Sequence, residues 1–265
     1  MCKDCGCSGH HHEHGHHHHH DHDHHDHHGE HTHTRPDGST YTHTHNAAEA
    51  REIAIGSAIL SANDQLAAEN RGYFRGRKIT ALNLISSPGS GKTTLLVKTL
   101  EELNAAGIKA AVIVGDQYGD IDAKRMQATG CAVTQIETHS SCHLDAARVQ
   151  SVLDTAVPEG TQILFIENVG NLVCPVAFDL GEKAKIALLS TAEGEEKPLK
   201  YPALFAAAKL VLITKCDLEA ALDWNYELVV KNIKQVNPDA QVLRISAKTK
   251  EGLDNWIEFL KQNLN

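Results

Sequence analysis

The chain has 265 residues, a hydrophobic fraction of 41% and a formal net charge of -9. This length suffices for one α/β domain with an appendage, and the acidic balance argues against a nucleic-acid-binding protein, which needs clustered Lys and Arg. Because no run of 18 or more apolar residues and no signal-peptide pattern is present, we expect no membrane span and a cytoplasmic location.

Residues 1–45 are predicted to be a Cys/His-rich metal-binding tail. All but two of the 20 histidines lie here, interleaved with Asp, Glu and Gly. The tail has too few apolar side chains to offset the entropy lost on ordering, so we expect it to be disordered without metal. Cys2, Cys5 and Cys7 place three thiolates in one short loop, which suits Ni(II) as well as Zn(II). The many imidazoles would bind further ions weakly and buffer them.

Residues 46–77 are predicted to form a helical segment that packs on the body of the protein. The helix is expected to run from Ala47 to about Arg71, with acidic and basic side chains away from its apolar side. The residues expected along that apolar side are Ile53, Ile55, Ile59, Ala62 and Leu66.

Residues 78–265 are predicted to be an α/β domain with a mostly parallel sheet flanked by helices. Short apolar runs predict buried strands at Ile79–Ile85, Ala110–Val114, Ala132–Ile136, Ile163–Ile166, Leu210–Ile213 and Val242–Ile245. Amphipathic segments predict helices at Lys92–Ala106, Leu144–Thr155, Asn225–Val236 and Leu253–Leu260. Buried strands that alternate with helices are typical of a parallel sheet covered on both faces.

The first strand leads into Ser86–Thr94, with the sequence SSPGSGKTT, and a helix follows. This pattern matches the phosphate loop G-x-x-x-x-G-K-[ST] except that a serine replaces the first glycine. In such a loop, backbone N–H groups converge on the phosphates, the lysine reaches the β- and γ-phosphates, and the following hydroxyl binds Mg²⁺. We therefore assign nucleotide binding to Gly89, Ser90, Gly91, Lys92, Thr93 and Thr94.

Two later segments predict that the nucleotide carries guanine. Residues 214–217, TKCD, follow a strand and differ from the N-K-x-D motif of GTPases only by Thr in place of Asn. The Asp217 carboxylate would accept hydrogen bonds from guanine, whereas adenine presents an acceptor at the same edge and leaves the carboxylate unpaired. Ser246 and Ala247 begin an S-A-K segment that matches the loop over guanine. With Lys215, these residues favour GTP over ATP.

Acidic residues at two strand ends are candidates for a magnesium site. Glu167 and Asp116 each follow a predicted strand, and an acid in this place near a phosphate loop commonly holds Mg²⁺. Asp116 is also consistent with an ordinary turn residue. The predicted magnesium ligands are thus Thr93, Asp116 and Glu167, and the predicted catalytic groups are Lys92, Asp116 and Glu167. Gly170, three positions beyond Glu167, is placed to sense the γ-phosphate.

Three further residues of the body are candidate metal ligands. Cys142 and His143 precede the helix expected to begin near Leu144, and a thiol at a helix N-terminus has a lowered pKa. Cys174 lies seven positions beyond Glu167. Two or three ligands leave a metal site incomplete, so a site shared between two chains is consistent with this set. The other cysteines of the body are assigned to its core: Cys131 and Cys216.

The order of these motifs resembles the hydrogenase nickel-incorporation GTPases, the HypB-type accessory proteins. The resemblance covers nearly the whole chain and rests on MCKDCGC, the His-rich tract, SSPGSGKTT, the Cys-His pair, ENVGNLVCP and TKCD. Ser86 and Thr214 depart from the general phosphate-loop GTPase pattern but are tolerated in this family.

The resemblance implies GTP hydrolysis coupled to nickel delivery. It assigns a tight nickel site to Cys2, Cys5 and Cys7. A second site for nickel or zinc near a dimer interface would use three residues of the body: Cys142, His143 and Cys174. It also implies GTP-promoted homodimerisation, a zinc-containing maturation partner, and the large subunit of [NiFe]-hydrogenase as the recipient of nickel.

Three other functions are compatible with parts of the sequence. A urease-type nickel-loading GTPase shares the fold, but its Cys-Pro-His and Gly-Gly-Asp patterns are absent here. A nickel storage protein with a vestigial GTPase is opposed by the intact Lys92, Thr93 and Asp217. A small-molecule kinase is opposed by the two guanine motifs.

Overall fold

The structure is a computed structural model that describes residues 30–34, 40–44, 47–117 and 119–264. The chain divides into two compact units, Met1–Ser61 and Ala62–Asn265. The division falls inside helix α1 (Ala47–Gly76), so the first half of this helix belongs to one unit and its second half to the other.

The first unit contains a β-hairpin within the segment for which we expected no regular structure. Strands β1 (Glu30–Thr34) and β2 (Thr40–Thr44) pair antiparallel, with His31 opposite His43. Threonine stands at alternate positions in both strands, and this β-branched residue favours extended backbone. A lone two-stranded hairpin is nevertheless only marginally stable in water. The rest of the tail, including Cys2, Cys5 and Cys7, lies outside the described residues, so its metal binding stays a prediction.

In the second unit, the buried side of helix α1 differs in part from the one predicted. Ile55 and Ile59 are 52% and 40% exposed, and Ala62 is exposed as well. In the second unit the helix instead buries the stripe Asn63, Ala67, Asn70 and Phe74. The predicted side is only partly correct in this unit, because Leu66 is half-buried whereas Ala62 is exposed, and the side chain of Ile53 lies outside the described part of the chain. A count of apolar residues could not detect the two buried asparagines that satisfy backbone groups of the body. Asn63 and Asn70 both bond to Ala146, through its N–H and its carbonyl respectively.

The second unit is built on a fully parallel sheet of seven strands, which confirms the predicted fold class. In spatial order the strands are β5 (Ala132–Glu137), β4 (Ala110–Asp116), β6 (Ile163–Glu167), β3 (Thr80–Ser86), β7 (Ala184–Ser190), β8 (Ala208–Thr214) and β9 (Gln241–Ile245). Strand β7 was missed from sequence. Its sequence AKIALLS contains residues that are depleted in strands, and its position between β3 and β8 decides its conformation.

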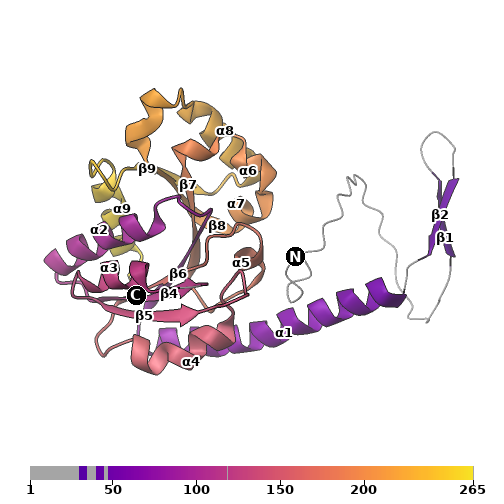
Figure 1. Cartoon of the computed structure of the whole chain (residues 1–265), viewed down its shortest axis with the longest axis horizontal. Coiled ribbons are helices and arrows are strands. Elements are labelled where there is room, and N and C mark those ends of the chain that lie inside the picture. The colour runs from indigo at the N-terminus through magenta and orange to yellow at the C-terminus, as the bar shows by residue number, and fades with distance from the viewer. Residues whose placement is uncertain (1–29, 35–39, 45–46, 118, 265) are drawn as a thin grey trace. The chain divides into compact units, whose positions relative to one another are not determined.

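Helices cover both faces of the sheet (Figure 1), because successive strand residues point to opposite sides. One face packs against α2 (Lys92–Ala105), α3 (Ile121–Gln127) and α9 (Leu253–Gln262). The other packs against the second half of α1, α4 (Ala146–Ala156), α7 (Pro202–Ala207) and α8 (Tyr226–Val236). Short helices complete the unit: α5 (Cys174–Ala177), α6 (Lys197–Lys200), and the 3-10 turns η1 (Thr191–Glu193) and η2 (Cys216–Ala221). No helix in the described residues combines the length and apolar character required to cross a membrane.

Candidate functional site

The segment between β3 and α2 has the backbone of an anion-binding loop. Gly91, directly before the helix, has a φ of 97°, and Gly89 has a φ of 72°, values that favour glycine. Ser86 has no positive φ, so the first position of the motif needs no glycine here. Its hydroxyl instead accepts a hydrogen bond of 2.8 Å from Lys92 Nζ. The free N–H groups at the start of α2 face the place where phosphates bind in such loops.

A buried acid and a buried base lie beside this loop. Thr93 Oγ1 donates to Glu167 Oε1 at 2.8 Å, and Glu167 and Lys92 are 5% and 7% exposed. Burial raises the pKa of Glu167 to about 7, against the opposing effects of the Lys92 charge and the Thr93 hydroxyl. Burial likewise lowers the pKa of Lys92, against the nearby Glu167 carboxylate. Each group therefore depends on a compensating charge to stay ionised.

These residues fit a hard divalent cation. Glu167 Oε2 is buried and has no hydrogen-bond partner among the described residues. An unpaired buried carboxylate oxygen beside a threonine hydroxyl matches the oxygen ligands that Mg²⁺ takes in nucleotide sites. Asp116 lies at the same edge of the sheet, where its Oδ1 accepts from Gln117 N at 2.7 Å.

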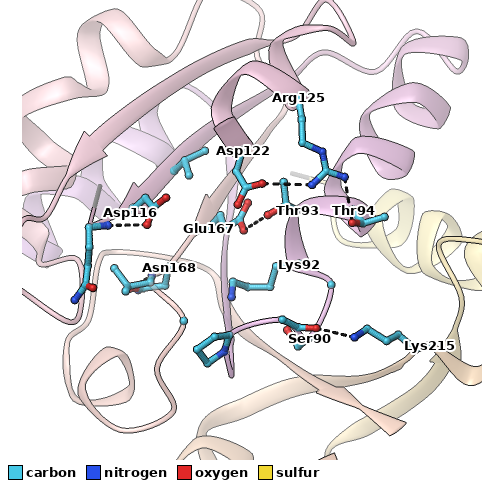
Figure 2. Close-up of a pocket in the computed structure, with 18 residues that line it drawn as sticks. Ser90, Lys92, Thr93, Thr94, Asp116, Asp122, Arg125, Glu167, Asn168 and Lys215 are labelled. Carbon is cyan, nitrogen blue, oxygen red and sulfur yellow. Dashed lines mark hydrogen bonds and ion pairs between the residues drawn. The ribbon is translucent and has the colours of Figure 1, made fainter. Parts of the chain in front are cut away.

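A cavity of about 560 Å³ lies above the phosphate loop at the carboxyl ends of the parallel strands (Figure 2). This edge is where open α/β sheets bind their ligands. The predicted lining residues include Lys92, Asp116, Glu167 and Gly170. The cavity is also lined by residues to which the sequence analysis gave no role, among them Asp122, Arg125 and Asn168. A sequence signal existed for the first two, since they follow Asp116 closely on the short helix α3.

A second cavity of about 290 Å³ lies beside the TKCD segment. Ser246 Oγ donates to Asp217 Oδ1 at 2.6 Å, so the two predicted guanine motifs are in contact. Thr214 Oγ1 donates to Ser90 O at 2.7 Å, and Lys215 Nζ donates to Gly89 O at 2.7 Å. The threonine that replaces the usual asparagine thus still ties this segment to the phosphate loop.

The two cavities adjoin, so they form one site with two ends. Both are lined by Ser90, Gly91, Thr94 and Lys215. One end holds the buried lysine and the carboxylates, and the other holds the apolar walls, Asp217 and Ser246. An elongated ligand with phosphates at one end and a base at the other matches this division.

The structure also brings together the three candidate ligands of the body. One ligand atom from each of Cys142, His143 and Cys174 lies within 4.8 Å of the others. His143 and Cys174 are 4% and 5% exposed, and Cys142 is half-buried. The His143 ring stacks on Phe178 with 4.0 Å between ring centroids, which holds the imidazole in place. Two thiols and one imidazole at this spacing form the donor set that late transition metals prefer.

Cys142 does not lie at a helix N-terminus, contrary to our prediction. Helix α4 begins at Ala146, and Asp145 is its N-cap, with a carboxylate that accepts from Arg148 N at 2.8 Å. A side-chain oxygen at this position satisfies the free N–H groups of the first turn. The first turn of the helix therefore has its cap from Asp145 and not from Cys142.

The cluster is connected to the phosphate end of the cavity through Asn168. Its Oδ1 accepts from Leu144 N, next to His143, at 3.1 Å, and its Nδ2 donates to Asn83 Oδ1 at 3.2 Å. Leu144 packs so closely on Gly115 that a Cβ added there would lie 2.6 Å from it. The loop that carries Cys142 and His143 is thus fastened to the strand ends that carry Asp116 and Glu167.

The segment after Glu167 lies directly on the phosphate loop. A Cβ added at Gly170 would lie 3.0 Å from Pro88 Cα, a tight contact that a glycine avoids. Cys174 follows within the same short segment and begins α5. A shift of this segment would therefore move residues both at the phosphate loop and at the cluster of Cys142, His143 and Cys174.

The two remaining cysteines of the body differ in burial. Cys216 is 5% exposed, and burial raises its pKa to about 11, which agrees with the prediction of a core residue. Cys131 packs at the margin of the core, is only half-buried, and its thiol lies 3.5 Å from Asn104 Oδ1.

Comparison with known proteins matches residues 80–244 to the CobW/HypB/UreG nucleotide-binding domain. The chain is 48% identical over 215 residues to a hydrogenase maturation factor HypB of Azotobacter chroococcum, covering 81% of this chain and 70% of that protein. The crystal structure of HypB from Helicobacter pylori in complex with nickel is 36% identical, with a TM-score of 0.72, over 76% of this chain and 94% of that one. HypB from Archaeoglobus fulgidus also has a TM-score of 0.72, at 35% identity, covering 77% of this chain and 100% of that one.

Proposed function

Because this chain belongs to the HypB-type hydrogenase maturation factors of the CobW/HypB/UreG family, we propose that it is a GTP-hydrolysing nickel metallochaperone. In this proposal it binds nickel in the cytoplasm and delivers it to the large subunit of [NiFe]-hydrogenase. The observation that carries the proposal is the connection of the Cys142–His143–Cys174 cluster to the segment beside the phosphate loop.

The proposed hydrolysis takes place at the phosphate end of the site. Gly89, Ser90 and Gly91 present backbone N–H groups to the phosphates, and Lys92 neutralises charge on the β- and γ-phosphates. Thr93, Glu167 and Asp116 would hold Mg²⁺, which when bound neutralises the developing phosphate charge. Asp116 and Glu167 also orient water near the γ-phosphate. The Lys92 charge lowers the pKa of Glu167 and the Glu167 carboxylate raises the pKa of Lys92, so each charge opposes the effect of burial on the other group.

The proposed guanine end distinguishes GTP from ATP. Asp217 accepts the ring N–H and amino group of the base, and Ser246 holds that carboxylate by a hydrogen bond of 2.6 Å. Ala247 and Lys215 form walls of the cavity. Selectivity follows because adenine would supply neither of the two base donors, which leaves the carboxylate with the Ser246 hydrogen bond alone.

Nickel is the cargo in this proposal. Cys142, His143 and Cys174 supply three donors for nickel or zinc, and a second copy of the chain would complete the site in a GTP-promoted homodimer. The HypB structure from Helicobacter pylori is a complex with nickel, which supports the choice of cargo. Cys2, Cys5 and Cys7 are proposed as a separate tight nickel site, and a zinc-containing maturation partner is proposed to assist delivery.

A direct test follows nickel and nucleotide together. Purified protein loaded with ⁶³Ni is mixed with the nickel-free hydrogenase large subunit and the zinc-containing partner, with GTP, GDP or ATP. We expect transfer to be fastest with GTP. Transfer that is equally fast without nucleotide would favour a storage protein, and transfer preferentially to urease would favour the urease-type alternative.

Replacement of Asp217 by asparagine tests the guanine end. We expect GTP binding to weaken about tenfold or more and affinity for xanthosine triphosphate to rise, because an amide can donate where the carboxylate only accepts. The measurement is competition between the two nucleotides, with Asp223→Asn as an exposed control. If ATP displaces GTP from the wild type at equal concentration, the guanine assignment is incorrect.

Deletion of residues 10–45 tests whether the histidines of the tail bind many ions weakly while its cysteines bind one ion tightly. We expect most bound nickel to be lost while one tight ion remains on Cys2, Cys5 and Cys7, because many weak imidazoles set capacity and thiolates set affinity. The measurement is chelator competition on the intact and shortened proteins. Loss of the tightest binding in the shortened protein would refute this division.

A further inference from the structure

One cationic side chain of the nucleotide cavity has no part in the proposed function so far. Arg125 extends from α3 toward the first turn of α2, where its Nη2 donates to Thr94 Oγ1 at 3.3 Å (Figure 2). Its Nη1 lies 3.4 Å from Asp122 Oδ1. Both contacts are long, and its side chain is 49% exposed. A guanidinium carries five N–H donors, so Arg125 retains donors for a ligand.

The position of Thr94 identifies which part of a nucleotide Arg125 faces. Thr94 is exposed and lines both the 560 Å³ cavity and the 290 Å³ cavity. Lys92 and Glu167 line only the larger of these two cavities, and Asp217 lines only the smaller one. The part of a nucleoside triphosphate that lies between its base and its terminal phosphates is the ribose and the α-phosphate. Of these two, only the α-phosphate is an anion.

We propose that Arg125 binds the α-phosphate of the nucleotide, a group that GDP and GTP share. This inference rests on the proposed nucleotide site and adds a residue to it. When the ligand enters, the guanidinium exchanges its long contacts with Thr94 and Asp122 for charge-assisted hydrogen bonds to phosphate oxygens, which are shorter and stronger.

The consequence is a contribution to binding rather than to the hydrolytic step. A group that contacts the α-phosphate meets the same charge in GDP, in GTP and in the transition state, so it stabilises all three alike. This differs from an arginine that acts on the γ-phosphate, whose loss lowers kcat by about 10³-fold or more. Loss of the Arg125 side chain should therefore raise the dissociation constants of both nucleotides by the same factor. It should also raise KM for GTP.

The test compares Arg125→Ala and Arg125→Lys with Lys124→Ala in the full chain. Lys124 is the matched control because it is an exposed cation on the same helix that pairs with Asp120, away from Thr94. We expect Arg125→Ala to raise the Kd of GDP and of a non-hydrolysable GTP analogue by the same factor, about tenfold or more. Arg125→Lys should recover part of the loss, because it keeps the charge but not the planar fork. Lys124→Ala should bind as the wild type does.

A sulfur-substituted nucleotide locates the contact on the α-phosphate. GDP with one non-bridging α-oxygen replaced by sulfur should bind the wild type more weakly than GDP in at least one stereoisomer, and Arg125→Ala should remove most of that difference. If the sulfur substitution weakens binding by the same factor in the wild type and in Arg125→Ala, the assignment is overturned. It is also overturned if Arg125→Ala leaves the Kd of GDP unchanged, or if this variant weakens binding of the GTP analogue and lowers kcat only. If the wild type fails to bind either guanine nucleotide, the proposed function itself fails, which is a distinct result.

Discussion

Replacement of Lys92 by alanine is expected to reduce GTP hydrolysis to below about one hundredth of the wild-type rate, the typical effect of removing a charged group from a transition state. Lys92 is the buried cation of the phosphate loop, and its Nζ lies 2.8 Å from Ser86 Oγ. Its charge would face the β- and γ-phosphates, where negative charge shifts during hydrolysis. The measurement is phosphate release at saturating GTP and magnesium.

The fold should survive this substitution. Burial already opposes the charge of Lys92, so its removal also removes a desolvation cost. The matched control is Lys98→Ala, on the same helix, where a half-buried lysine outside the nucleotide cavity pairs with Glu101. The control should hydrolyse GTP at the wild-type rate. A Lys92→Ala protein that keeps more than a tenth of wild-type activity would contradict the proposed role of this lysine.

Replacement of Cys174 by alanine is expected to abolish the dependence of metal affinity on nucleotide state. In the wild type, the segment from Glu167 to Gly170 lies on the phosphate loop, and Cys174 follows it. A change at the γ-phosphate should therefore move one ligand relative to Cys142 and His143. Loss of a thiolate from three ligands should also weaken metal binding about tenfold or more, since 1.4 kcal/mol suffices for this factor.

The measurement is nickel and zinc affinity of protein lacking residues 1–45, titrated with GDP and with a non-hydrolysable GTP analogue. Because linkage is reciprocal, bound metal should change the affinity ratio of the two nucleotides by the same factor. Cys131→Ala is the control, since this half-buried cysteine lies outside the cluster. Equal metal affinities in both nucleotide states of the wild type would disprove the coupling, while leaving the metal site itself in place.

Much of the lining of the two adjoining cavities was predictable because its residues come from short contiguous segments of the chain. The segment from Ser86 to Thr94 matches the phosphate-loop pattern except at its first glycine, and TKCD matches the N-K-x-D pattern except at its first residue. Such motifs depend on local backbone geometry, namely a strand, a turn with positive φ at glycine, and a helix start. The alternation of buried strands and helices likewise predicted the parallel sheet, since both faces of such a sheet must be covered.

The tertiary structure alone decided which separate segments meet. Strand β3 lies between β6 and β7, and this order brings Asn83 against Asn168 and hence Leu144 against the phosphate end of the site. The tertiary structure also brings Arg125 of α3 within hydrogen-bond distance of Thr94 of α2. These contacts join residues far apart in sequence through single polar atoms, so they leave no periodic pattern that a sequence could display. The packing side of α1 was predicted only in part for the same reason, because buried Asn63 and Asn70 bond to backbone groups that only the folded body presents.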